Sequence, residues 1–255
     1  MRRGRGKPLV LVHGLGGSWH SWSPVLNALA GERELIVPDL PGFGDSPKLA
    51  GPTTIATLAD ALVAYFDENG LGAVDVVGTS MGARLVLELA RRGRVGAVVA
   101  LDPGGFWEGW ERTFFATSVG LSVKLVRAIE PALPILTALP LGRALLFAQF
   151  SARPWALSRE VALTELATFI KTPVFDEVLG ALANGPVQAG MPRGSATRPI
   201  VIGWGRQDRV CLPTQADRAI ARFPDARLHW FETSGHFPQW DAPDETVRLV
   251  LETTA

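Results

Sequence analysis

Residues 78–82 read Gly-Thr-Ser-Met-Gly and follow directly on the apolar run Val74–Val77. That run is short and β-branched, as expected of a buried strand. Residues 83–90 are good helix formers, and Gly93 is expected to end the helix that they form. One interpretation of residues 78–82 is that they form only a flexible loop. The strand before them and the helix after them instead favour a tight turn that exposes the hydroxyl of Ser80. The sequence therefore predicts a nucleophilic serine at the positive end of a helix dipole.

The composition is that of an ordinary globular chain: 255 residues, 47% hydrophobic and 20% charged. Lysine plus arginine and aspartate plus glutamate number 25 each, so no overall field favours nucleic acid or an anionic membrane. No apolar run approaches the ~20 residues of a membrane-spanning helix. We expect the basic residues 2–7 to fray as a terminus, and a cytoplasmic location fits the single cysteine, Cys211. That count leaves no internal disulfide and no cysteine-based zinc site, and we expect neither a metal nor a cofactor.

Strand-like and helix-like runs alternate along most of the chain. The strand-like runs lie at 9–12, 34–37, 74–77, 97–101, 199–202 and 228–231. Near-continuous apolar strands that alternate with helices predict a parallel sheet covered on both faces. Residues 103–197 break this rhythm with helical patterns, many aromatics and several prolines. We predict a core domain of residues 1–102 and 198–255, with 103–197 inserted as a helical cap.

The glycine-rich stretch His13–Gly17 follows the first strand-like run. A turn of this kind exposes backbone N–H groups that can stabilise the oxyanion of a tetrahedral intermediate. The expected donors are the N–H groups of Leu15 and Met81. The alternative is that the glycines only form a tight turn.

Two further polar residues follow late strands. Asp208 ends the stretch Gly203–Asp208, and His236 lies in the loop Ser234–Pro238. An acid at a strand end can orient a histidine, which can then act as general base for Ser80. The alternatives are that Asp208 only caps a turn and that His236 is a solvated loop residue. Asp102 ends another strand-like run and is a competing acid, although the Gly-x-x-Asp turn favours Asp208.

Five ordered motifs make the chain resemble a capped α/β-hydrolase fold protein. They are His13–Gly17, Asp39–Ser46, Gly78–Gly82, Gly203–Asp208 and Gly235-His236. The resemblance implies a nucleophile at Ser80, a base at His236, an acid at Asp208, an oxyanion hole at Leu15 and Met81, and no cofactor. It also implies a mostly parallel sheet of about six strands. The family usually opens with an antiparallel hairpin, and this chain has only eight residues before Leu9, so that the hairpin is missing or the true start lies upstream.

We therefore expect a serine hydrolase that cleaves carboxylic esters of apolar acyl or aryl groups through an acyl-enzyme on Ser80. Gly14, Trp107 and Phe237 are the expected substrate contacts, and the protein is a monomer or homodimer. A C–C bond hydrolase or a thioesterase-type enzyme with the same three residues is the closest alternative. A buried arginine facing Ser80, among Arg84, Arg143, Arg153 and Arg206, would favour that alternative. A ligand-binding, receptor-like protein on the same fold is a more distant one.

Overall fold

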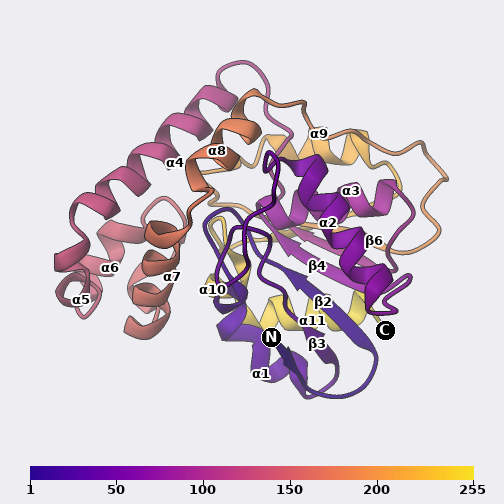
Figure 1. Cartoon of the computed structure of the whole chain (residues 1–255), viewed down its shortest axis with the longest axis horizontal. Helices are drawn as coiled ribbons and strands as arrows, with labels where there is room; N and C mark the ends of the chain where they lie inside the picture. The colour runs from indigo at the N-terminus through magenta and orange to yellow at the C-terminus, as the bar shows by residue number, and fades with distance from the viewer.

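A central sheet of seven strands organises the computed structural model, which describes residues 1–255 (Figure 1). The strands are β1 (Arg2–Arg3), β2 (Pro8–Val12), β3 (Glu34–Ile36), β4 (Asp75–Thr79), β5 (Val98–Leu101), β6 (Ile200–Gly205) and β7 (Arg227–Phe231). Their order in the sheet is β1-β3-β2-β4-β5-β6-β7. All neighbours pair in parallel except β1 and β3. The α/β-hydrolase fold expected from the motifs, with six parallel strands, is confirmed.

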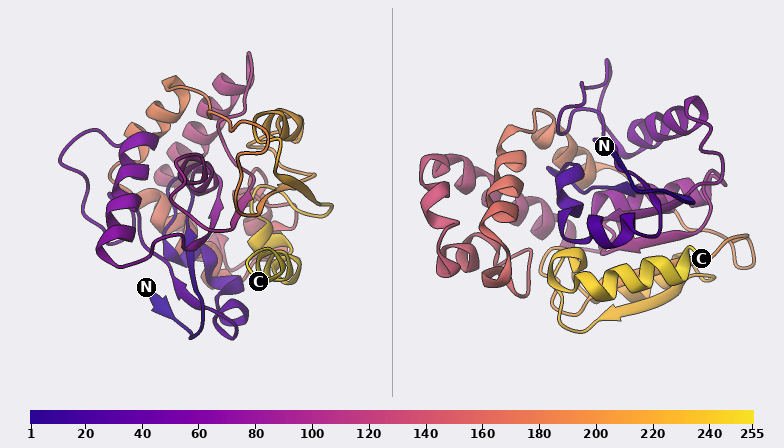
Figure 2. Two further views of the ribbon diagram at one scale, coloured as in Figure 1. Left: turned by 90° about the vertical axis from the view of Figure 1, so that its right-hand side faces the viewer. Right: turned by 90° about the horizontal axis from the view of Figure 1, so that it is seen from below.

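Helices cover both faces of the sheet (Figure 2). The helices outside the segment between β5 and β6 are η1 (Trp19–Trp22), α1 (Ser23–Ala30), α2 (Ile55–Glu68), α3 (Met81–Arg91), α9 (Gln215–Arg222), α10 (Pro238–Asp241) and α11 (Pro243–Thr253). Alternate residues of each strand point to opposite faces, so that Val76 packs on the side of α2 and α3 and Val77 on the side of α1 and α11. The two apolar layers hold β4, the strand that leads to Ser80, at the centre of the sheet.

The chain start forms part of the sheet, so the expectation of a frayed basic terminus is wrong. Arg2 and Arg3 pair antiparallel with Ile36 and Leu35. The terminal ammonium group also donates to the carbonyl of Val37 at 2.9 Å. Backbone pairing with an edge strand outweighs the like charge of the side chains, which stay exposed.

Residues 102–199, between β5 and β6, contain helices and no strand, and we call them the helical insertion. Its helices are α4 (Glu111–Ala128), η2 (Glu130–Ala132), α5 (Leu133–Leu136), α6 (Pro140–Phe147), η3 (Pro154–Ala156), α7 (Arg159–Lys171) and α8 (Phe175–Asn184). They lie beyond the carboxyl ends of the strands (Figure 1). The division of the chain into two domains stays a prediction. No helix of the structure is both long enough and apolar enough to cross a membrane.

Candidate active site

Ser80 lies in the sharp turn between β4 and α3, with φ 55° and ψ −116°. The turn forces close backbone approaches that only glycine permits. A Cβ atom at Gly78 would lie 2.2 Å from the carbonyl oxygen of Gly82, and one at Gly82 would lie 2.2 Å from that of Val12. Both glycines of the motif are therefore required for steric reasons. The packing around Ser80 holds its strained backbone in place.

His236 connects Ser80 to Asp208. Its Nε2 lies 2.9 Å from the Oγ of Ser80, and its Nδ1 lies 2.8 Å from an Oδ of Asp208. The other Oδ of Asp208 accepts from the backbone N–H groups of Val210 and Cys211 at 2.7 and 3.1 Å. A carboxylate can only accept, so Nδ1 carries the proton and Nε2 accepts from the serine hydroxyl. The structure thus brings together three of the sequence-predicted residues, although they are far apart in the chain.

Asp102, the competing acid, does not contact the histidine. One of its carboxyl oxygens accepts from the N–H of Gly205 at 2.8 Å, and its backbone has a positive φ of 47°. Burial, followed by the nearby charge of Asp208, raises the pKa of the Asp102 carboxyl well above its ordinary value. Asp102 is therefore a buried neighbour of the acid that contacts His236, and it has no hydrogen bond to the histidine.

The expected oxyanion donors belong to the turn after β2, which carries Leu15, and to the start of α3, which carries Met81. Met81 is the first residue of α3, where backbone N–H groups have no acceptor within the helix. The N–H of Leu15 makes no hydrogen bond within the protein. His13 fixes this turn, because its Nε2 accepts from the N–H of Leu40 at 3.0 Å and its Nδ1 lies 2.8 Å from the carbonyl of Gly14. Burial lowers the pKa of His13, so the ring that makes these two bonds is neutral.

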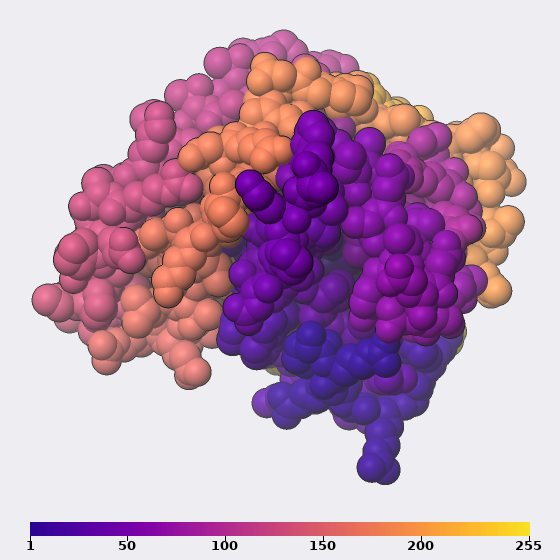
Figure 3. Space-filling view, in the orientation of Figure 1, coloured from indigo at the N-terminus to yellow at the C-terminus, as the bar shows by residue number.

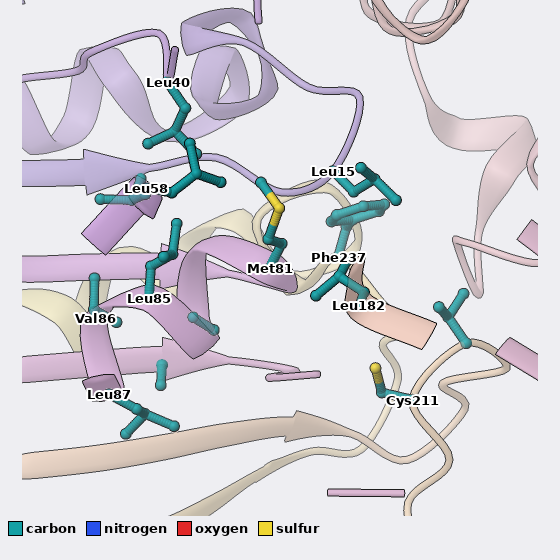
Figure 4. Packing of buried hydrophobic residues seen from close by; sticks show 14 of the residues in the cluster. Leu15, Leu40, Leu58, Met81, Leu85, Val86, Leu87, Leu182, Cys211 and Phe237 are labelled. Atoms are coloured by element: carbon teal, nitrogen blue, oxygen red, sulfur yellow. The ribbon is translucent and has the colours of Figure 1, made fainter. Parts of the chain in front are cut away.

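The three expected substrate contacts lie in different surroundings. A Cβ atom at Gly14 would lie 3.1 Å from the Cβ of Ser80, so Gly14 lies directly against the nucleophile. Phe237 follows His236 and is gathered with Leu15 and Met81 at the start of α3 (Figure 4). Trp107 is buried instead against Phe115 of the insertion, with ring centres 4.9 Å apart. Contact of these residues with a substrate stays a prediction.

Two buried acids near this site were not singled out from the sequence. Asp241 accepts hydrogen bonds from Ser151 and Ala152 of the insertion and from Gly235 beside the histidine. Glu165 of α7 accepts from the hydroxyl of Ser21 at 3.0 Å. Each acid looks like an ordinary surface charge of a helix, and its burial depends on contacts between distant segments. The only available signal was that Asp241 lies five positions after His236 in a short aromatic stretch.

Of the four arginines considered, only Arg84 is buried, at 3% exposed. It lies on α3 one turn after Ser80, and one Nη donates to the carbonyl of Pro186 at 2.5 Å. Its Nε and other Nη have no protein partner. Burial lowers the pKa of Arg84 to about 10, so the side chain remains a cation at neutral pH. Arg206, by contrast, stacks on Trp230 at the surface.

Asp208, Cys211 and His236 offer ligand atoms within 4.8 Å of one another. Burial raises the pKa of the Cys211 thiol well above its ordinary value, and the charge of Asp208 adds to this effect. A thiol must lose its proton to bind a metal, and both other residues already have hydrogen-bond partners. The chemistry of this cluster therefore does not fit a metal ion.

Comparison with known proteins agrees with the fold described above. A sequence model described as the alpha/beta hydrolase family matches residues 9–249. The chain is 30% identical over 265 residues to 2-hydroxymuconate semialdehyde hydrolase of Pseudomonas putida. The aligned region covers 97% of this chain and 87% of that protein. It is also 30% identical to the dihydrolipoyllysine-residue acetyltransferase component of the acetoin cleaving system of Cupriavidus necator, of whose length it spans 64%.

Among solved structures, an esterase from Exiguobacterium antarcticum superposes with a TM-score of 0.80. The match covers 100% of this chain and 94% of the esterase, at 18% identity, and therefore speaks for the fold alone. Because the family's sequence model matches residues 9–249, which include all five motifs and the strands from β3 to β7, the chain belongs to the alpha/beta hydrolase family.

Proposed function

We propose that the protein is a serine hydrolase that cleaves carboxylic esters of apolar acyl or aryl groups. The observation that carries this proposal is the continuous hydrogen-bonded series from Ser80 through His236 to Asp208, beside the free N–H of Leu15. The aromatic side chains around the series, among them Phe150 and Phe237, whose ring centres are 6.1 Å apart, support an apolar substrate.

In the first half of this reaction, the Oγ of Ser80 attacks the ester carbonyl while its proton moves to the Nε2 of His236. The N–H groups of Leu15 and Met81 stabilise the oxyanion, and each such donor typically contributes about 3–4 kcal/mol. The tetrahedral intermediate collapses to an acyl-enzyme, and the leaving alkoxide takes the proton from His236. Asp208 keeps the ring oriented and stabilises its cation.

In the second half, His236 removes a proton from water, which attacks the acyl carbonyl. The second tetrahedral intermediate releases the carboxylic acid and returns the proton to Ser80. Atoms balance as ester plus water giving acid plus alcohol. No step requires a metal or a cofactor.

The test is hydrolysis of p-nitrophenyl acetate, butyrate and octanoate by the wild type and Ser80→Ala. We expect turnover in the wild type and a loss of roughly 10⁴-fold or more in the variant. A fluorophosphonate probe should label the wild type and not Ser80→Ala. Equal turnover in both proteins would overturn the proposal, and labelling without turnover of any ester would shift support to the alternative below.

A second candidate is hydrolysis of a C–C bond in a dienoic keto acid, or of a thioester, by the same side chains. It is supported by the relative named 2-hydroxymuconate semialdehyde hydrolase and by Arg84, a buried cation with two unpartnered nitrogens on the helix that follows Ser80. Under this candidate, Arg84→Gln should raise KM for a dienoic keto acid and leave KM for p-nitrophenyl acetate unchanged. The exposed Arg206→Gln serves as the control.

A further inference from the structure

The exposed apolar side chains of this protein are concentrated in the helical insertion. Apart from Met1, the exposed large hydrophobic residues all lie between residues 110 and 155. Six of them are aliphatic, come from the C-terminal half of α4 and from the α5–α6 segment, and are 54–73% exposed: Leu121, Leu125, Ile135, Leu139, Leu141 and Leu145. We call these six the apolar surface. Isolated exposed leucines are normal, but six in 25 residues mark an interaction surface.

Hydrogen bonds hold the segments that carry the apolar surface together. Ser122 of α4 donates to the side chain of Gln149, just after α6, at 2.7 Å. Arg143 of α6 donates to the carbonyls of Thr137 and Trp155 at 2.8 and 3.0 Å. These helices form the outer end of the molecule, away from the sheet (Figure 3). The apolar surface is therefore a fixed part of the fold and faces outward.

The charge around the apolar surface is predominantly positive. Residues 111–160 contain six basic and three acidic side chains, an excess of three positive charges in a chain whose total is zero, and one of the six, Arg127, is paired with Asp176 of α8. Lys124 and Arg153 are exposed, and Arg159 donates to the carbonyl of Pro134, next to Ile135. Overall neutrality thus conceals a cationic end. The indole of Trp155, 54% exposed, adds a side chain that favours the boundary between water and lipid.

We propose that the apolar surface docks on an anionic lipid surface, with the aliphatic side chains entering the headgroup region and the basic side chains contacting the headgroups. A second copy of this chain is a poor partner for the apolar surface, because the charges that surround the surface would be alike on both copies. A two-fold dimer would place the same surface against itself, and with it the two cationic ends. An anionic leaflet complements the charge, and each basic side chain near such a leaflet strengthens binding about fivefold. The proposal is independent of the ester chemistry at Ser80.

The test is sedimentation of the full chain with vesicles of phosphatidylcholine, alone or with about a third phosphatidylglycerol. We expect binding to the anionic vesicles that weakens at high salt. Leu141→Ser/Leu145→Ser should reduce the partition coefficient at least tenfold. Lys124→Gln/Arg153→Gln should reduce it on anionic vesicles alone, by roughly 25-fold from two charges. Arg5→Gln/Arg198→Gln removes the same charge from exposed positions that precede β2 and β6, and should leave binding unchanged.

Two results would overturn the proposal. One is absence of wild-type binding to anionic vesicles. The other is equal loss of binding in the Arg5→Gln/Arg198→Gln control, which would mean attraction without a defined surface. Light scattering after gel filtration runs in parallel: a dimer that Leu141→Ser/Leu145→Ser dissociates, without vesicle binding, would assign the surface to a second copy. An unchanged melting temperature shows that each variant is folded.

Discussion

The carboxylate of Asp241 accepts a hydrogen bond from the backbone N–H of Gly235 at 2.8 Å, one residue before His236. The same carboxylate accepts from the N–H of Ala152 at 2.8 Å and from the hydroxyl of Ser151, both in the helical insertion. Asp241 is only 5% exposed. One buried carboxylate therefore joins the insertion to the loop that carries His236.

Replacing Asp241 with asparagine should weaken both sides of this connection. The amide turns two donor hydrogens toward groups that already donate, and we expect a loss of about 2–3 kcal/mol in the free energy of unfolding. Ester turnover per folded molecule should also fall, because the His236 loop loses a positioning contact. Chemical denaturation and kcat for p-nitrophenyl acetate measure the two effects. Asp244→Asn, at an exposed position, is the control. Reduced stability with unchanged turnover would limit Asp241 to holding the insertion.

The two buried aspartates at the strand ends should respond differently to amide substitution. Asp102 accepts from the N–H of Gly205 and not from His236, so Asp102→Asn conserves its shape and the histidine's partner, and we expect kcat/KM within about threefold of the wild type. Asp208→Asn removes the acceptor for Nδ1 of His236 and permits the wrong tautomer, with an expected loss of roughly 10⁴-fold. Equal losses in both variants would show that Asp102 takes part in orienting the histidine.

Glu165 should make stability depend on pH. Burial raises the pKa of this carboxyl from 4.5 to about 8 in the folded protein. Between these values the unfolded chain has released the proton that the folded chain retains, so stability falls as pH rises from about 4.5 to about 8. Glu165→Gln should flatten this slope and raise the melting temperature at pH 8. Glu160→Gln, exposed on the same helix, should keep the wild-type slope. The comparison is a set of melting curves from pH 5 to 8.

Gly16 couples the predicted oxyanion turn to the insertion. Its φ is +73°, and a Cβ atom there would lie 2.2 Å from the ring of Phe169. Gly16→Ala should therefore cost about 1–3 kcal/mol of stability and lower ester turnover, because either the turn or α7 must shift. Gly51→Ala, where no atom lies within 4 Å of the new Cβ, is the matched control. A wild-type melting temperature for Gly16→Ala would contradict the contact.

Local patterns were enough to predict the six parallel strands, the sharp turn at Ser80 and the residues that meet around His236. The Gly-x-Ser-x-Gly pattern has steric causes within a few residues, and parallel strands bring their carboxyl ends to one edge. Contacts between the insertion and the core have no such local cause. Glu165 and Asp241 are buried only because Ser21 and Ser151 approach from elsewhere in the chain. The pairing of Arg2 with Ile36 was missed for the same reason, since a basic dipeptide alone carries no strand signal.

The backbone of Ser80, with φ 55°, makes the stability of the turn and the identity of the residue at position 80 compete. Glycine adopts this backbone conformation with the least strain, so Ser80→Gly would relieve strain in the turn while removing the proposed nucleophile. Heat tolerance and chemistry therefore favour different residues at the same position. A library of this chain screened for heat resistance alone would accumulate glycine at position 80, and its most heat-resistant members would lack the proposed nucleophile.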